Sequence, residues 1–303
     1  RPPRSTLFPY TTLFRSDITA SVGLEAFAKT FPERFVSLGI AEQNCVGVAA
    51  GLALGGKIPV FATYAVFAAL RAADQIRISL CYNRLHVIIG GAHAGISVGP
   101  DGATHQALED LALMRALPHM QILSPCDATQ ASRAVQAAVS EMKGPVYIRF
   151  GREAVPDFTP PDFPFVPGEA QILQEGRDIT LVATGHMVWE ALQAAELLAQ
   201  DGIAAAVVNM HTLKPADAGT LIRMARKTGC VVTAEEHQVA GGLGSLTAEI
   251  LSLHCPVPMA MVGMQDSFGE SGPPADLMEK YGLTARGIFT AALNLVKHKR
   301  KIK

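Results

Sequence analysis

The sequence lacks the features that mark secreted, zinc-stabilised and membrane proteins. Its five cysteines are odd in number, widely spaced and without a CxxC pair, which argues against a disulfide framework and a cysteine zinc site and favours free thiols in a reducing compartment. The longest apolar stretch, residues 46–56, is too short and too rich in glycine to cross a bilayer. No secretory leader is recognisable. These absences predict a cytoplasmic protein without a membrane segment.

Charge is scarce as well. Only 17% of the residues are charged and the formal net charge is −1, so bulk electrostatics do not indicate a nucleic-acid partner. With 49% hydrophobic residues, a chain of 303 residues can form two domains of ordinary size, each with its own core.

Short apolar runs alternate with helical patterns along most of the chain. In the first half the predicted strands are 34–38, 58–63, 85–90, 121–123 and 146–149, with helices at 41–54, 69–82, 106–116 and 128–141. In the second half the predicted strands are 178–184, 204–209, 230–235 and 257–262, with helices at 188–200, 216–227, from 244 onward and at 288–297. This alternation indicates parallel sheets that are covered by helices on both faces. We therefore predict an α/β fold of two tandem, doubly wound parallel-sheet domains.

Two segments interrupt the pattern. Residues 156–168 contain five prolines and three phenylalanines and are interpreted as a linker between domains at 17–155 and 169–303. Residues 1–16 contain three prolines and show no periodicity of either kind, so they are interpreted as a foreign or artefactual leader, with a natural disordered extension as the alternative.

Polar and aromatic residues follow successive predicted strands of the first half. Glu42 opens an apolar helix after strand 34–38, Tyr64 and Phe67 follow strand 58–63, His93 follows strand 85–90, and Arg152 follows strand 146–149. Ligands of open parallel sheets bind beyond the carboxyl ends of the strands, so these side chains are expected to line one rim. A buried carboxyl at position 42 would need a specific partner, because desolvation disfavours its charge.

The loop GPDGATHQ at residues 99–106 adds hydrogen-bonding groups to this rim. Its glycines permit close approach to a ligand, Asp101 and His105 can bond to hydroxyl groups, and His105 can also move protons. Arg152 has the forked geometry that suits phosphate, with Arg149 as an alternative. Tyr64 and Phe67 can stack on a planar ligand, although aromatics three residues apart are also typical of a core.

Together, GIAEQN at 39–44, TYAVF at 63–67, His93 and DGATH at 101–105 resemble the pyrimidine-binding half of the transketolase family. These enzymes use thiamine diphosphate to move two-carbon units between sugars. The resemblance implies that Glu42 is catalytic and shares a proton with the pyrimidine ring of the cofactor. It also implies that Phe67, with Tyr64 beside it, stacks on that ring, whereas the third aromatic of the larger enzymes is replaced by Leu70.

The resemblance also implies roles toward small sugar substrates. The family equivalents of Asp101 and His105 recognise substrate hydroxyls, with His105 as a second catalytic residue, and those of His93 and Arg152 hold the sugar phosphate. The remainder of the chain resembles the transketolase C-terminal domain, to which no catalysis is assigned.

One part of the family pattern is missing. The sequence contains no Gly-Asp-Gly run of the kind that holds magnesium and the diphosphate. We therefore expect a separate N-terminal transketolase subunit to bind Mg²⁺, and we assign no metal ligand to this chain. This chain would then be the C-terminal subunit of a split transketolase, inactive without its partner.

Small residues recur every four positions at Gly47, Gly51 and Gly55, where two helices could approach closely. In the family this region lies at the dimer interface, which implies a homodimer contact and thus a heterotetramer. Packing against a helix of the same chain is the alternative.

Two other functions compete with transketolase. A 1-deoxyxylulose-5-phosphate synthase shares the glutamate and the fold but usually comes as one long chain, and a non-catalytic transketolase-like binding subunit would need none of the site residues. The β subunits of 2-oxoacid dehydrogenases are disfavoured because they lack the Asp-Gly-x-Thr-His loop. Substitution Glu42→Gln separates an enzyme from a binding subunit.

Overall fold

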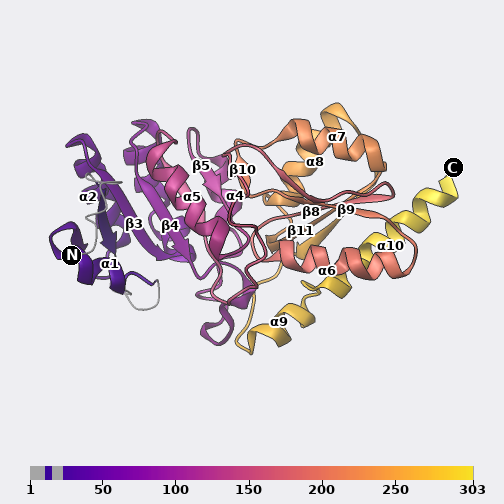
Figure 1. The fold of residues 1–303 in the computed structure, drawn as a ribbon. Helices are drawn as coiled ribbons and strands as arrows, with labels where there is room; N and C mark the ends of the chain where they lie inside the picture. The colour runs from indigo at the N-terminus through magenta and orange to yellow at the C-terminus, as the bar shows by residue number, and fades with distance from the viewer. Residues whose placement is uncertain (1–10, 16–22, 303) are drawn as a thin grey trace.

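The computed structural model describes residues 11–15 and 23–302. Figure 1 shows two α/β halves arranged side by side, each built on its own sheet. The first sheet has seven strands and the second has five. The predicted fold class, with two tandem sheet-and-helix domains, is confirmed.

The first sheet has the strand order β10-β5-β6-β4-β3-β1-β2. Its first six strands are β1 (Thr11–Arg15), β2 (Phe35–Ser37), β3 (Ile58–Tyr64), β4 (Ile88–Ala92), β5 (Gln121–Leu123) and β6 (Val146–Arg149). Pairing is parallel from β5 through β6, β4, β3 and β1 to β2. The helices of this half are α1 (Glu25–Thr30), α2 (Glu42–Leu54), α3 (Ala73–Gln75), α4 (Asp110–Ala116) and α5 (Ala128–Ser140). The five strands predicted for this half are all present.

β1 falls inside the predicted leader. Residues 11–15 pair with both β2 and β3 and so complete the sheet between them. Residues 1–10 and 16 of that segment lie outside the described residues, and a foreign origin of the leader stays a prediction.

Two predicted helices differ in the structure. The segment expected as one helix at 69–82 consists of a π-helical stretch at Phe67–Arg71, the short α3, and a second π-helical stretch at Ile76–Tyr82. Apolar periodicity alone does not separate these wider turns from an α-helix. The helix expected from residue 106 begins only at Asp110, because the Gln106 side chain donates a hydrogen bond to the Ile96 carbonyl and holds its segment on the preceding loop.

The second sheet has the order β12-β11-β8-β9-β7. Its strands are β7 (Gln171–Gln174), β8 (Ile179–Ala183), β9 (Ala205–Asn209), β11 (Val231–Gln238) and β12 (Met259–Met264). Its helices are α6 (Met187–Gln200), α7 (Ala218–Thr228), α8 (Leu243–His254), α9 (Pro274–Lys280) and α10 (Ala285–Ile302). In Figure 1, α7 and α8 lie on one face of this sheet and α6 and α10 on the other.

Neither sheet is purely parallel, which corrects a detail of the prediction. β7 pairs antiparallel with β9, and β10 (Thr212–Lys214) leaves the second half to pair antiparallel with β5 of the first sheet. Such short strands carry too little periodicity to be found in the sequence. The short helix α9 was not predicted either.

The two halves also share a core. Val208 and Met210 of the second half belong to the same buried cluster as Phe61 and Tyr147 of the first. Residues 150–170 between the halves contain no helix or strand, and the exact domain boundaries stay predictions. All five cysteines are free thiols, as expected. Within the described residues, no helix combines the length and apolarity needed to cross a bilayer.

Candidate active site

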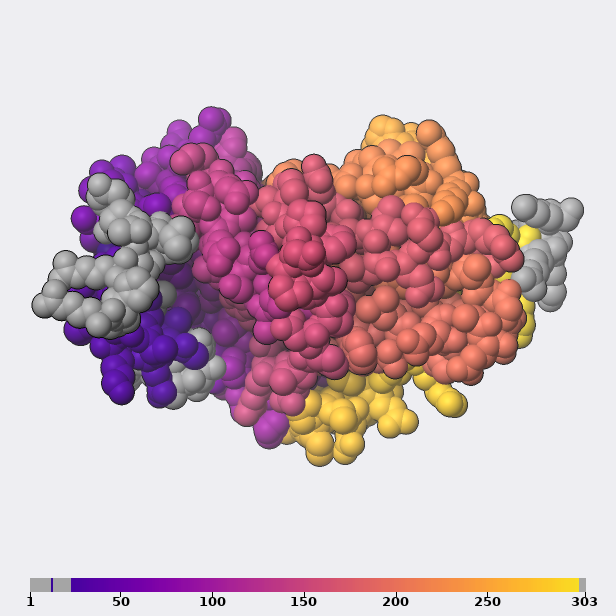
Figure 2. Space-filling model, viewed as in Figure 1, coloured from indigo at the N-terminus to yellow at the C-terminus, as the bar shows by residue number. Residues whose placement is uncertain are grey.

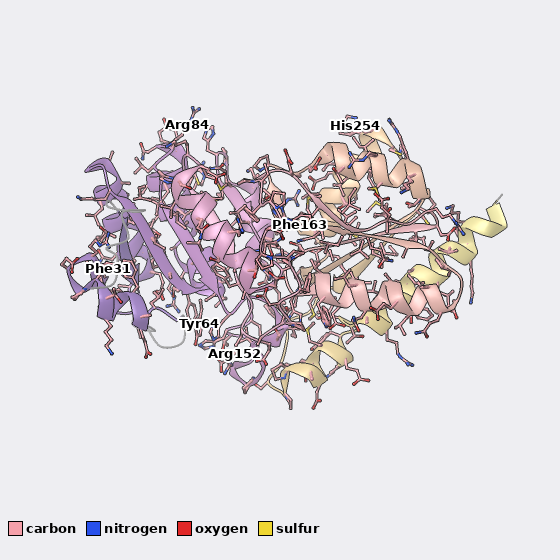
Figure 3. The ribbon with its side chains drawn as sticks, in the orientation of Figure 1. Phe31, Tyr64, Arg84, Arg152, Phe163 and His254 are labelled. Atoms are coloured by element: carbon pink, nitrogen blue, oxygen red, sulfur yellow. The ribbon has the colours of Figure 1, made fainter. Side chains whose placement is uncertain are left out.

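The site is built at the carboxyl edge of the first sheet. Tyr64 is the last residue of β3, and Phe67 opens the π-helical stretch that follows. His93 comes directly after β4, and Arg152 follows β6. Because these strands run parallel, their carboxyl ends share one edge, and Figure 3 shows Tyr64 and Arg152 at the same lower rim.

Glu42 is the first residue of α2, and only 1% of it is exposed. The apolar residues Cys45, Val46 and Ala49 on the same helix are buried behind it. Burial and the nearby Glu42 charge raise the pKa of the Cys45 thiol to about 11, so this cysteine stays protonated. The Glu42 carboxyl therefore lies beside the buried, apolar face of α2.

Arg71 is the partner of this acid and was not among the predicted site residues. Its Nη1 atom donates a 2.9 Å hydrogen bond to Oε2 of Glu42, and its backbone carbonyl accepts a bond from the Gln43 side chain. Arg71 is the single basic residue between Ile58 and Ile76, and a lone cation in so apolar a stretch is the signal that could have found it.

Arg71 also joins the acid to the predicted stacking ring. Its Cζ atom lies over the Phe67 ring, 4.2 Å from the ring centroid. A planar group therefore already makes two contacts here, an N–H bond to Glu42 and a cation–π contact with the face of Phe67. A planar nitrogen heterocycle could bond to Glu42 and stack on Phe67 in the same places, so Glu42 and Phe67 fit the pyrimidine of thiamine diphosphate.

Four predicted side chains form one cluster of rings. Tyr64 stacks on His93 with 4.3 Å between ring centroids and lies 5.9 Å from Phe67 with nearly parallel rings. His105 meets both aromatic rings edge-on, at 5.3 Å from Phe67 and 5.9 Å from Tyr64. Its Nδ1 atom lies 2.9 Å from the Thr104 hydroxyl, which fixes the orientation of the imidazole.

His93 has an unusual backbone and an unusual charge balance. Its φ of 54° lies in the left-handed region, which is strained for a residue other than glycine and is common at functional sites. Burial lowers the pKa of His93, and the positive charge of Arg152 acts in the same direction against the opposing effect of Asp101. His93 is thus neutral at pH 7, and its Nδ1 atom is buried without a hydrogen-bond partner among the described residues.

The two arginines after β6 behave differently. Arg152 is about one-third exposed, and its Nη1 donates to the Val98 carbonyl at 2.6 Å and to Asp101 at 3.3 Å. Arg149 is buried and forms a forked ion pair with Asp110, at 2.9 Å and 3.2 Å. Since Arg149 is committed to this pair, Arg152 is the arginine that remains available to a ligand.

The seven predicted site residues thus belong to one connected group. Glu42 reaches Phe67 through Arg71, and Phe67 reaches His93 through the rings of Tyr64 and His105. Asp101 and Arg152 complete the group as charged neighbours of His93.

Gly47, Gly51 and Gly55 lie along an exposed face of α2. A Cβ atom added to Gly47 or Gly51 would meet nothing within 4 Å in the described residues, so no helix described here packs against these two glycines. The adjacent side chains of Ile40 and Leu54 are 74% and 75% exposed.

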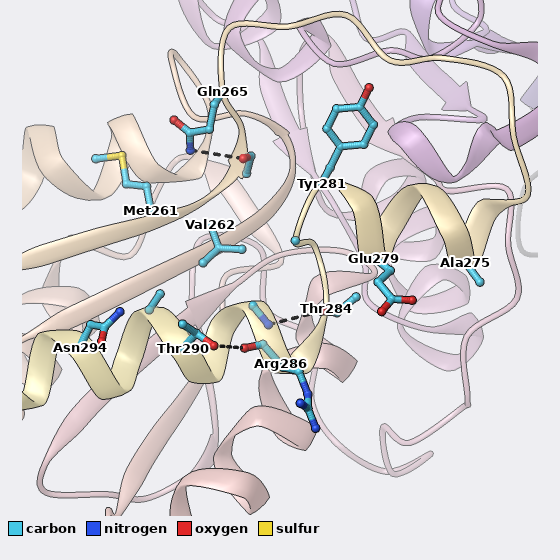
Figure 4. A pocket seen from close by; sticks show the side chains of 14 residues that line it. Met261, Val262, Gln265, Ala275, Glu279, Tyr281, Thr284, Arg286, Thr290 and Asn294 are labelled. Carbon is cyan, nitrogen blue, oxygen red and sulfur yellow. Dashed lines mark hydrogen bonds between the residues drawn. The ribbon is translucent and has the colours of Figure 1, made fainter.

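A separate cavity of about 810 Å³ lies in the second half and contains none of the predicted site residues. Figure 4 shows it between β12 and α10. Three polar groups of its lining are bonded within the fold: Thr290 donates to the Arg286 carbonyl, Gln265 to the Gly263 carbonyl, and Thr284 accepts from the Gly287 amide. Glu279, Arg286 and Asn294 also line the cavity, so it is not a purely apolar space.

Two family models and several known proteins match this chain over most of its length. The family described as "Transketolase, pyrimidine binding domain" matches residues 9–157, and "Transketolase, C-terminal domain" matches residues 168–288. A 6-deoxy-6-sulfo-D-fructose transketolase subunit, SqwH of Clostridium sp. (strain MSTE9), is 44% identical over 94% of this chain and 88% of its own length.

Two further relatives differ in how much of their own length this chain covers. A 1-deoxy-D-xylulose-5-phosphate synthase from Pelotomaculum thermopropionicum is 40% identical over 94% of this chain, but the match spans only 46% of that protein. A solved structure of a split gene transketolase, described as an inactive beta4 tetramer, superposes with a TM-score of 0.88 and is 52% identical, covering 95% of this chain and 93% of its own. On the family matches and these identities, the chain is a member of the transketolase family.

Proposed function

We propose that this chain is the C-terminal subunit of a split, thiamine-diphosphate-dependent transketolase that transfers a two-carbon ketol unit between sugars. The observation that carries the proposal is the buried Glu42 carboxylate, which a planar guanidinium links to the face of Phe67. The relative from Clostridium is itself described as a transketolase subunit, which supports the division into two chains.

Thiamine diphosphate, when bound, supplies an acidic carbon that can add to the carbonyl of a ketose. Glu42 would hold a proton at the pyrimidine ring nitrogen and return it, which is general acid–base work in a water-poor site. Phe67, with Tyr64 beside it, would stack on the pyrimidine. Arg71 would have to move away from Glu42, and its half-exposed side chain can do so into solvent.

The remaining residues act on the sugar. Asp101 would bind substrate hydroxyls, and His105 would bind them and also move a proton as hydroxyl and carbonyl groups interchange. His93, neutral because burial and Arg152 lower its pKa, would help to hold the sugar phosphate. Arg152 would hold an anionic terminus such as a phosphate.

A second polypeptide completes the site in this proposal. A separate N-terminal subunit would bind the diphosphate and Mg²⁺, and the open glycine face of α2 would make a homodimer contact, giving a heterotetramer. The description of the solved relative as an inactive tetramer supports the expectation that this chain alone is inactive.

A second candidate is one half of a 1-deoxyxylulose-5-phosphate synthase, favoured by 40% identity to such an enzyme over nearly the whole chain. The product separates the two: a synthase half forms a 1-deoxypentulose phosphate, whereas a transketolase transfers a ketol group between sugars.

The test combines this chain with a separate N-terminal transketolase subunit and measures carbon transfer from a panel of ketose donors. Neither chain alone should transfer carbon, and the pair should. Glu42→Gln in the pair should lower the rate by roughly 10²- to 10⁴-fold, because an amide cannot exchange the proton. The partner affinity of this variant, measured by ultracentrifugation, should be unchanged. Strong transfer by this chain alone would refute the split enzyme, and an active Glu42→Gln pair would refute the role of the acid.

A further inference from the structure

The loop that carries Asp101 rests on the second half of the chain. The backbone amide of Ser97, in the 3-10 segment Ile96–Asp101, donates a 2.6 Å hydrogen bond to Oε1 of Glu236. Glu236 lies in β11 of the second sheet and is only 3% exposed. A short bond to a buried carboxylate is among the stronger contacts that can hold a backbone segment in place.

The loop has little space in which to shift. A Cβ atom at Gly95 would lie 2.3 Å from Glu236, one at Gly102 would lie 2.5 Å from the Ser271 hydroxyl, and one at Gly99 would lie 2.9 Å from Pro274. In Figure 2 the yellow surface around α9 lies directly beside the first half at its lower edge. The loop therefore packs closely against the second half.

The side chain of Gln106 is a second tie. Its Nε2 atom donates to the carbonyls of Ile96 and Gly99 in the loop and of Glu270 in the second half. Gln106 lies next to His105. The loop from Gly95 to Gln106 is therefore fixed to the second half near both of its ends, at Ser97 and at Gln106.

Glu236 itself is held firmly. The Arg149 guanidinium, already paired with Asp110, donates a 2.9 Å bond to the Glu236 backbone carbonyl. His186 lies 3.8 Å from the free oxygen of the Glu236 carboxylate. The backbone of Glu236 is therefore anchored, and its buried carboxylate lies where the Ser97 amide can bond to it.

We propose that Glu236 is a positioning residue of the active site: its carboxylate fixes the Ser97 amide and thereby sets the places of Asp101 and His105. This inference rests on the proposed function, and it gives the second half a role beyond assembly. Glu236 does not touch the substrate. It acts through the loop, where a displacement of about 1 Å can cost roughly a hundredfold in rate.

The kinetic test uses the assembled enzyme with Glu236→Ala, Glu236→Gln and the control Glu190→Ala. Glu190 accepts a 2.6 Å bond from the Ala285 amide, so the control removes the same kind of contact from a backbone amide outside the loop. Glu236→Ala should lower kcat/KM for the ketose donor by roughly tenfold to a hundredfold, mainly by raising the donor KM. Glu236→Gln, whose amide oxygen can still accept the Ser97 bond, should restore most of this loss. Thiamine diphosphate affinity, measured by titration, should not change in either variant.

A second readout does not depend on activity. Amide hydrogen exchange in the full chain should accelerate over residues 95–102 in Glu236→Ala and remain as in wild type in Glu190→Ala. If the wild-type pair transfers no carbon, the proposed function fails while the exchange result still tests Glu236. Unchanged exchange over this loop, an equal kinetic loss in Glu190→Ala, or no rescue by Glu236→Gln would each overturn the inference.

Discussion

The guanidinium of Arg71 bonds to Glu42 at 2.9 Å while it covers the Phe67 ring. The two partners differ in environment: the Arg71 side chain is 46% exposed, whereas that of Glu42 is 1% exposed. Only the arginine can leave the pair without moving the backbone. The arginine shields the acid from an otherwise apolar wall, and under the proposed function it would yield that place to a planar ligand.

Substitution Arg71→Met tests this relationship. It keeps the aliphatic stem but leaves the buried Glu42 carboxylate without its cation, so the free energy of unfolding of the isolated chain should fall by about 1 kcal/mol, a modest loss because the guanidinium is half exposed and screened. The measurement is urea denaturation, with Arg77→Met, on the following helical stretch, as the control. The assembled variant should bind thiamine diphosphate at least as tightly as wild type, and a clearly weaker affinity would contradict the prediction.

Arg152 should select for charge on the substrate. Arg152→Gln removes the cation beside Asp101 and should raise KM about tenfold for a donor with a phosphate terminus, in line with the loss of one charge-assisted hydrogen bond. The KM for an uncharged ketose should stay within about twofold of wild type. Equal effects on the two donors, measured in the same preparation, would show that Arg152 does not read the terminal charge.

The pair Arg149–Asp110 should behave as a buried unit. Arg149→Met leaves the Asp110 carboxylate, which has no side-chain exposure, without its cation and should cost about 3–5 kcal/mol of stability. The double variant Asp110→Asn, Arg149→Met should cost less than Arg149→Met alone, because no unpaired charge remains buried. Denaturant unfolding of the four proteins in this cycle gives the coupling, and simple additivity would contradict it.

His211 should make the protein sensitive to acid. It is fully buried against the Phe165 ring, and burial lowers its pKa from 6.5 to about 4. Above pH 6.5 the residue is neutral in both the folded and unfolded chains and has no effect on stability. As the pH falls from 6.5 to 4 the unfolded chain takes up the proton first, so stability should drop by about 3 kcal/mol. Thermal unfolding of His211→Gln should show a shallower decline over this interval, and an unchanged slope would rule His211 out.

The strands and their ends were readable because buried parallel strands are continuous apolar runs with functional residues just beyond them. Glu42, Tyr64, His93 and Arg152 were placed on one rim by this rule alone, and the structure brings them together there. The contact of Arg71 with Glu42 spans 29 positions and depends on a π-helical stretch that no apolar period reveals.

Other features escaped prediction because distant partners create them. β10 has three residues and becomes a strand only because β5, about ninety positions earlier, offers a free edge. The bond from Ser97 to Glu236 likewise joins residues 139 positions apart. Such long-range pairings leave no pattern in the local sequence, so they cannot be predicted from it.

The crossing of β10 into the neighbouring sheet has a consequence for how this protein can be dissected or recombined. A fragment that stops after the proline-rich stretch would leave the outer edge of β5 open to pairing with other chains, which promotes aggregation. A chimera that exchanges only one half between relatives would have to preserve the register of Thr212 and Lys214 on β5 as well. Backbone hydrogen bonds thus join the two halves, and the second half supplies the edge strand of the first sheet.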